Sequence, residues 1–162
     1  MQFNDKHSFD KPAASVIKMF ADKAYLERKY KDLGFRNIEV LEHSVDAKKF
    51  RIKVRYSAPN SAPLPDFAKK FLGETNVITQ TDSWDIEKKT GRLDAEIRGV
   101  PVKVYADMTL KDEGAGSANT LKWNLNCGIP FIGGKLEEVV AGDIKAKSKG
   151  DMAKSREILK SY

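Results

Sequence analysis

The sequence contains few of the side chains that hold metals or cross-link chains. It has one cysteine, Cys127, and two histidines, His7 and His43, and the three show no metal-ligand spacing. A single cysteine also excludes an internal disulfide and is typical of a reducing compartment. We therefore expect a cytoplasmic protein with no metal and no cofactor.

Long apolar runs are also missing. No segment approaches the roughly 20 apolar residues that a membrane-spanning helix needs, and the first ten residues do not form a secretory signal. The 41% hydrophobic and 32% charged residues are typical of a globular protein, and 162 residues suit one domain spanning 1–162. We expect no transmembrane segment, while peripheral contact with a membrane stays open.

The positive charge is not concentrated in one place. The net charge is +6, but acidic residues are interleaved with the basic ones, and no aromatic-studded basic stripe for single-stranded nucleic acid is present. Nucleic acid is therefore not the favoured partner. The last helix could still bind nucleic acid or anionic lipid through five cations: Lys145, Lys147, Lys149, Lys154 and Arg156.

The spacing of apolar residues predicts an α+β fold. Residues 2–9 alternate as a first strand, and residues 10–34 have the period of a helix that Asp10 could cap and that breaks in two near Asp22. From Phe35 the period is two, which predicts five or six further antiparallel strands. Residues 133–162 are helical again, so we expect the long C-terminal helix to lie on the apolar face of the sheet.

The segment GIPFIGGKLEEVV, residues 128–140, has the spaced glycines and the Gly-Lys pair of a phosphate-binding loop. The full pattern fails, because Ile129 stands where the first glycine belongs and Leu136 where a hydroxyl belongs. We interpret the segment as a hinge. Pro130 would end a strand, and Gly133 and Gly134 would adopt the unusual backbone angles of a sharp turn into the last helix.

Few side chains could carry chemistry inside such a domain. Cys127 alternates in phase with apolar residues and is interpreted as a buried hydrophobe, and His7 as a strand residue with a satisfied hydrogen bond. Gln80, Asp82 and Trp84 share one face of a strand, so both polar groups would face inward if the indole does. The simpler interpretation, favoured here, is that Asp82 faces water near a strand end, because no pair of carboxylates and no His–carboxylate pair is apparent.

Two segments resemble a known superfamily. KPAASVIKMFADKAYLERKY resembles the first helices of START-like (SRPBCC) helix-grip proteins, which include birch-pollen-allergen-like and polyketide-cyclase-like proteins. CGIPFIGGKLEEVV resembles the strand-to-helix junction of one uncharacterised, mainly actinobacterial subfamily. The resemblance covers nearly the whole chain in element order. It implies a curved sheet of six or seven strands that grips the C-terminal helix, with two short helices after the first strand and a cavity beneath the long helix.

The superfamily binds lipids, sterols, polyketides or plant hormones in that cavity, and a few members are enzymes. It shares no catalytic set, so the resemblance assigns no catalytic residue. We therefore predict binding or carriage of a small hydrophobic or amphipathic molecule, lipid-like or polyketide-like. A cyclase or hydrolase that uses the same cavity is the alternative, and the basic C-terminal helix as a binding surface is a second one.

The expected ligand-binding side chains are apolar or have a polar tip, and Tyr56, Gln80 and Asp82 would orient the polar end of the ligand. The full set is Phe20, Phe50, Ile52, Val54, Tyr56, Phe67, Phe71, Gln80, Asp82, Trp84, Val104, Met108, Trp123, Val139 and Val140. The ligand would pass between residues 59–72 and 128–134. The sequence does not indicate an oligomeric state.

Overall fold

Seven antiparallel strands form one curved sheet in the computed structural model, which describes residues 1–162. The strands are β1 (Gln2–Phe9), β2 (Arg36–Val45), β3 (Lys49–Pro59), β4 (Thr75–Asp85), β5 (Thr90–Ile97), β6 (Lys103–Glu113) and β7 (Gly116–Asn126). Their order is β1-β7-β6-β5-β4-β3-β2, so the first two strands of the chain lie at opposite edges. The predicted antiparallel sheet is confirmed.

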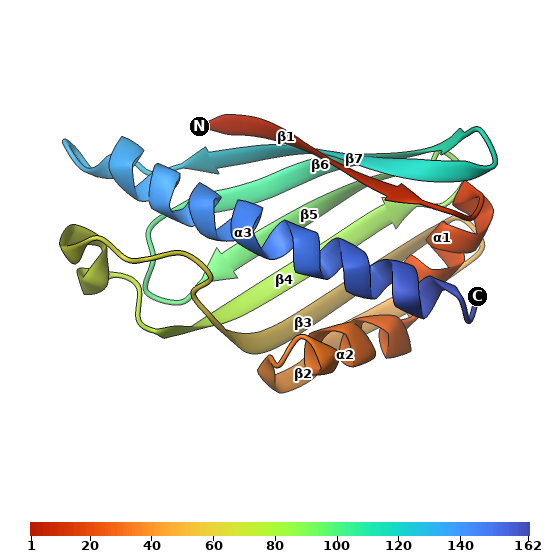
Figure 1. The fold of residues 1–162 in the computed structure, drawn as a ribbon, viewed down its shortest axis with the longest axis horizontal. Helices are drawn as coiled ribbons and strands as arrows, with labels where there is room; N and C mark the ends of the chain where they lie inside the picture. The colour runs from red at the N-terminus through yellow and green to blue at the C-terminus, as the bar shows by residue number, and fades with distance from the viewer.

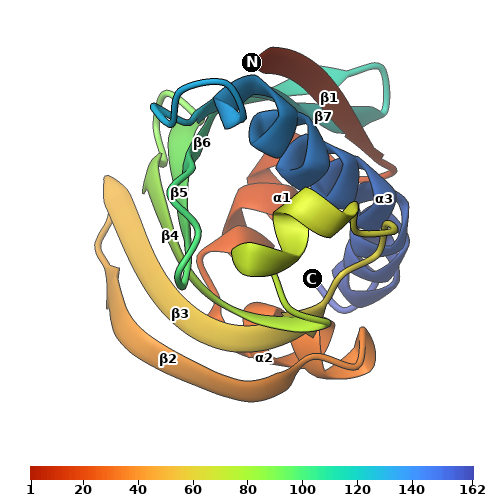
Figure 2. The same ribbon diagram turned by 90° about the vertical axis from the view of Figure 1, so that its left-hand side faces the viewer.

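Three helices lie on the concave side of the sheet (Figure 1). The helices α1 (Ala13–Phe20) and α2 (Lys23–Asp32) follow β1, and the long helix α3 (Gly133–Leu159) crosses the sheet. A short 3-10 helix, Asp66–Lys70, lies in the connection between β3 and β4. Figure 2 shows the sheet curving from β1 round to β2, with α3 closing the side between them. The expected grip on the C-terminal helix is confirmed. No helix is long and apolar enough to cross a membrane.

The predicted helix break near Asp22 agrees with the structure, whereas the predicted cap by Asp10 does not. The side chain of Asp22 accepts a hydrogen bond from the Ala24 N–H at 2.9 Å, which caps α2 and confirms the break between the two helices. The expected cap by Asp10 is wrong. The first N–H of α1, that of Ala13, donates instead to Oδ1 of Asp112 on β6 at 2.8 Å.

The junction between β7 and α3 turns sharply, but not through glycine angles. Gly133 and Gly134 both belong to α3 and have no positive φ; the residue in the left-handed region is Phe131, with φ of 69°. Gly133 is required for a different reason, since a Cβ there would lie 2.5 Å from the carbonyl oxygen of Cys127. The predicted unusual backbone angles are therefore wrong for both glycines; Gly133 is required for close packing, whereas a Cβ at Gly134 would meet no atom within 4 Å. Cys127 itself is a buried free cysteine, as expected.

The concave face of the sheet is the apolar one. On β3 the alternate residues Phe50, Ile52 and Val54 are at most 2% exposed and belong to a core cluster of 32 buried residues. On the opposite face Arg51 and Arg55 form ion pairs with glutamates of β2. The period of two in the sequence therefore corresponds to one buried and one wet face.

Trp84 depends on a glycine in the next strand. Its register partner on β5 is Gly91, and a Cβ at that position would lie 2.5 Å from the indole. The ring therefore lies flat over a position that can carry no side chain. Phe20 of α1 and Phe50 of β3 pack on the same indole, with ring centroids 5.6 and 6.3 Å from it.

We expect Gly91→Ala to lower the free energy of unfolding by about 1–3 kcal/mol, because the added methyl group forces the indole out of its packed position. Urea unfolding of the purified variant measures the loss. Gly142→Ala in α3 is the control: no atom lies within 4 Å of the added methyl, so stability should stay level or rise by up to about 1 kcal/mol. Equal effects of the two substitutions would contradict the packing described for Trp84.

Candidate ligand-binding cavity

A cavity of about 390 Å³ lies between the concave face of the sheet and the helices α2 and α3. Of its 34 lining residues, 20 are hydrophobic, and the polar ones come from β1, β4 and β7 on the sheet, from α2 and α3, and from the connection after β3. This volume lies within the range of small-molecule sites, which are typically mostly apolar with a few placed polar groups. The space is large enough for a small organic molecule.

Nine of the fifteen side chains expected to bind a ligand line this cavity. They are Phe20, Tyr56, Gln80, Asp82, Trp84, Val104, Met108, Trp123 and Val140. They come from α1, four of the strands and α3, so the fold brings together residues that are up to 120 positions apart in the chain. Their contact with a ligand stays a prediction.

The other six lie outside the cavity wall, and their expected position is corrected. Phe50, Ile52 and Val54 face the concave side but are packed in the core. Phe67 and Phe71 belong to the segment around the 3-10 helix and pack on the edge of the core. Val139 is half-buried one position before Val140, and this single helical step turns it away from the cavity.

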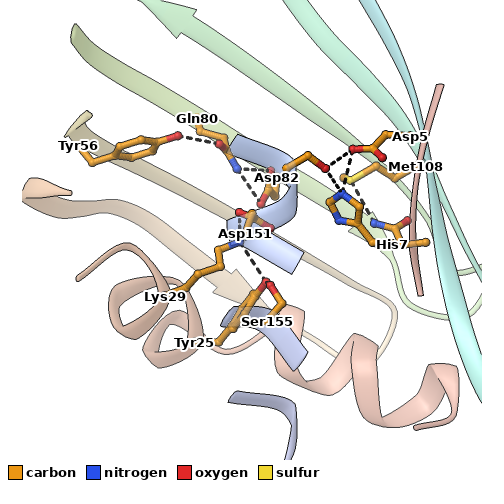
Figure 3. Close-up of polar contacts among 12 residues, drawn as sticks. Asp5, His7, Tyr25, Lys29, Tyr56, Gln80, Asp82, Met108, Asp151 and Ser155 are labelled. Carbon is orange, nitrogen blue, oxygen red and sulfur yellow. Dashed lines mark hydrogen bonds and ion pairs between the residues drawn. The ribbon is translucent and has the colours of Figure 1, made fainter. Parts of the chain in front are cut away.

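On the sheet side of the cavity a chain of hydrogen bonds ends at a carboxylate (Figure 3). The hydroxyl of Tyr56 donates to Oε1 of Gln80 at 3.1 Å. The amide nitrogen of Gln80 in turn donates to the two carboxylate oxygens of Asp82, at 3.2 and 3.3 Å. All three side chains belong to the face that the alternation of β3 and β4 turns inward.

On the helix side the cavity contains an ion pair. Nζ of Lys29 on α2 lies 3.0 Å from Oδ2 of Asp151 on α3 and donates to the hydroxyl of Tyr25 at 3.0 Å. The Tyr25 hydroxyl also forms a 2.8 Å hydrogen bond with Oγ of Ser155. Burial alone would lower the pKa of Lys29, but Asp151 and Tyr25 outweigh it, so the pKa is raised and the ammonium stays charged.

Asp82 lies where burial disfavours the ionised form of its carboxyl. Burial raises the pKa of its carboxyl to about 6, although the ammonium of Lys29 and the amide of Gln80 both oppose the shift. The residue is half-buried, and it lines the cavity and not the wet face of the sheet. The interpretation that Asp82 faces water is therefore wrong.

A second polar cluster joins β1 to α3. Nε2 of His7 lies 3.0 Å from both Oδ2 of Asp5 and Oγ of Ser148, and the Ser148 hydroxyl donates to the same Asp5 oxygen. The predicted hydrogen bond of His7 is confirmed. Burial would raise the pKa of Asp5, but the hydrogen bond from Ser148 and the nearby imidazole lower it overall. One imidazole nitrogen serves both partners, so this is not the relay of a nucleophilic triad.

Two buried polar atoms on β7 have no partner. They are Oδ1 of Asn119 and Nε1 of Trp123, whose residues are 3% and 9% exposed and line the cavity. The amide nitrogen of Asn119 makes only a weak contact of 3.9 Å with the sulfur of Met108. Buried polar groups are rarely left unpaired. A molecule in the cavity with one donor and one acceptor would satisfy both atoms.

Several polar residues of the cavity wall were not identified as site residues by the sequence analysis. Asp5 and His7 stand two apart on one strand face, which is a signal that could have been used. Lys29 and Asp151 gave none, because their ion pair joins helices that are distant in the chain, and Asn119 gave none, because its strand pattern does not show that its amide oxygen is left without a partner. No group of three or more histidine, cysteine or acidic side chains suits a metal ion.

Comparison with known proteins gives a family and a fold. Residues 5–155 match the family described as "Protein of unknown function (DUF2505)". No curated protein matches the chain. Among solved structures, the ZhuI aromatase/cyclase from Streptomyces sp. R1128 is 13% identical with a TM-score of 0.65, covering 99% of this chain and 93% of that one.

Two further solved structures are similar over nearly their whole length. Ara h 8.0201 is 16% identical with a TM-score of 0.66, over 100% of this chain and 99% of that one. Protein Ms6760 from Mycobacterium smegmatis is 13% identical with a TM-score of 0.66, over 99% and 91%. At such identities the likeness shows the fold alone, and it confirms the helix-grip architecture.

The raised pKa of Asp82 has a consequence for stability. An aspartate in an unfolded chain titrates near pH 3.9, whereas the folded protein holds this proton up to about pH 6. The folded state thus binds more protons in that window, so the contribution of Asp82 to stability falls as the pH rises through it and stays low above it.

We expect Asp82→Asn to raise the free energy of unfolding by about 1–3 kcal/mol at about pH 7.5 and to change it little at about pH 4, where the native carboxyl is already neutral. Urea unfolding at both pH values measures this. Glu96→Gln, on the exposed face of β5, is the control and should show no such pH-dependent gain. A difference between the variant and the native protein that is the same at both pH values would show that Asp82 is not a buried charge.

Proposed function

The chain belongs to the DUF2505 family, and we propose that it binds or carries a small amphipathic molecule in the cavity beneath α3. The observation that carries this proposal is the cavity itself: about 390 Å³ with a mostly apolar wall and two buried polar atoms left without partners. Binding energy would come mainly from burial of the ligand's apolar body. The polar groups would fix its orientation.

The ligand would lie along the sheet with polar groups within reach on both sides. Gln80 and Asp82 on β4 would meet one end, and Asn119 and the indole N–H of Trp123 on β7 would meet other polar groups. Leu93, from the strand next to β4, lines the wall between them. This arrangement favours a molecule with an apolar middle and polar substituents, lipid-like or polyketide-like.

Access is proposed between the segment 59–72 and residues 128–134, of which only the first contributes side chains to the cavity wall. Pro59 and Ser61 line the cavity there, and the Ser61 N–H donates to Oδ1 of Asp143 on α3 at 2.5 Å. Opening the route would break this contact between the segment and the helix. The narrower expectations of one domain over 1–162, a cytoplasmic location and a mainly actinobacterial family stay predictions.

Filling the cavity tests the proposal. Ala95 on β5 lines the cavity, so Ala95→Phe places a ring in the space proposed for the ligand. We expect it to weaken binding of the fluorescent apolar probe N-phenylnaphthylamine at least tenfold, measured by titration of the emission. Glu96→Phe adds the same ring on the opposite face of the same strand and should bind like the native protein. Equal binding by both variants, or none by the native protein, would refute the cavity as the binding site.

A second candidate function is acid–base catalysis of the cyclase or hydrolase type. Asp82 favours it, because a carboxyl with a pKa of about 6 inside an apolar cavity is suited to remove a proton near neutral pH. Proton abstraction next to a ketone carbonyl would leave an enolate, and the ammonium of Lys29, whose polar partners are Asp151 and Tyr25, is a cavity donor that could stabilise its oxygen.

We expect the native protein to catalyse hydrogen–deuterium exchange at the carbon next to the carbonyl of phenylbutanone in D₂O, and Asp82→Asn to reduce that rate at least tenfold. Proton NMR follows the loss of the signal. The rate should rise with pH through about 6 as Asp82 ionises. If the native protein gives the same rate as Asp82→Asn, Asp82 is not a general base and the carrier function stands alone.

The basic C-terminal helix is a weaker candidate, because most of its cations have partners within the chain. Lys147 pairs with Asp143 at 2.5 Å, Lys154 with Glu157 at 2.9 Å, and Arg156 donates to the Ser8 carbonyl at 2.7 Å. Lys145 lies over the ring of Phe3, 4.6 Å from its centroid. Such a surface offers few unpaired charges to a phosphate backbone.

A further inference from the structure

One carboxylate in the cavity wall differs from the others. Four line the cavity, and three have a basic partner: Asp5 with His7 at 3.0 Å, Asp143 with Lys147 at 2.5 Å, and Asp151 with Lys29 at 3.0 Å. Asp82 has no basic group within ion-pair distance, and its side-chain hydrogen bonds come only from the amide of Gln80. It is the one acidic group in the wall whose charge is not compensated.

The neighbouring charges do not remedy this. The ammonium of Lys29 acts on Asp82 from a distance and lowers the pKa of its carboxyl, but it is already paired with Asp151, whose negative charge partly offsets this effect. An ionised Asp82 therefore leaves this wall with a net negative charge. An unpaired charge away from water is costly, and the cost is removed when a cation comes into contact with it.

Aromatic rings flank Asp82 on both sides along β4. On one side Gln80 is bonded to Tyr56, whose ring lies 4.4 Å from that of Tyr30 between centroids. On the other side Trp84 lies 5.6 Å from Phe20. All of these rings line the cavity. A carboxylate in a wall of aromatic side chains is suited to an organic cation, because the carboxylate pairs with the charge and the apolar wall accepts the hydrocarbon part.

The chain already places one ammonium group in this environment. Nζ of Lys29 lies 4.8 Å from the ring centroid of Tyr25 and 5.1 Å from that of Tyr30, beside the carboxylate of Asp151. Asp82 is likewise a carboxylate in a cavity wall that contains aromatic residues, but no cation is paired with it. Asp82 lines the cavity, and the hydrogen bonds drawn to it in Figure 3 come from Gln80.

We propose that the molecule held in the cavity is an amphipathic amine, with a protonated amino group that pairs with Asp82 between Tyr56 and Trp84 and an apolar body that fills the space under α3. This inference rests on the proposed binding function and specifies the chemical class of the ligand. The amino group donates charge-assisted hydrogen bonds to the carboxylate. The amide of Gln80 continues to hold the carboxylate in place.

The test uses three probes that share one apolar body and differ in the end group: phenylbutylamine, phenylbutanol and phenylbutanoic acid. Isothermal titration calorimetry at about pH 7.5 measures each dissociation constant. We expect the amine to bind at least tenfold more tightly than the alcohol, and the acid to bind more weakly than the alcohol because Asp82 repels it. In Asp82→Asn the preference for the amine should shrink to about threefold or less. The control Glu96→Gln should keep the full preference.

The outcomes separate this inference from the function on which it rests. Equal binding of amine and alcohol, or an amine preference that survives Asp82→Asn, overturns the inference and leaves an apolar carrier. If the native protein binds none of the three probes, both the amine inference and the proposed binding function are overturned. Thermal unfolding of Asp82→Asn confirms that the variant is folded, and binding of the alcohol by that variant shows that its cavity is intact.

Discussion

The structure depends on a mismatch between a wide concave sheet and the one helix that closes it. Seven strands present an apolar inner face, but α3 is apolar towards them only near its start, at Val140 and Ile144, and again at its end, at Ile158 and Leu159. Between these two stretches, Lys147, Ser148 and Asp151 line the cavity. Polar side chains cannot pack against the apolar sheet as a core would, so a space remains between them. The proposed binding function follows from that space.

Asp82 is the cavity carboxylate without a basic partner, and both the acid–base function and the recognition of an amine depend on it. A carboxylate that has lost water and gained no cation can be neutralised by a proton or by a ligand. The first outcome provides an acid–base group near neutral pH, and the second provides a recognition site for an amine. The fold is compatible with both outcomes. The Tyr56–Gln80–Asp82 chain holds the carboxylate at the cavity wall in either case.

The sequence predicted those features that have a local period. Alternation predicted the strands and showed that Gln80, Asp82 and Trp84 share one face, and helical spacing predicted the break near Asp22 and the helix on the sheet. The grip of the sheet on that helix followed from the family resemblance. Contacts between distant elements have no such signature. The cap of α1 comes from Asp112, and Lys29 meets Asp151 only after α2 and α3 pack together. Asp82 was misjudged because a strand pattern shows which residues share a face and not whether water reaches them.

Native mass spectrometry measures the central claim most directly. The purified native protein and Ala95→Phe are each incubated with the same extract of amphipathic metabolites and then desalted. The account predicts discrete one-to-one adducts on the native protein that disappear on denaturation and are absent from Ala95→Phe. A bare mass for both proteins, or the same adducts on both, would contradict a cavity that holds a ligand between the sheet and α3.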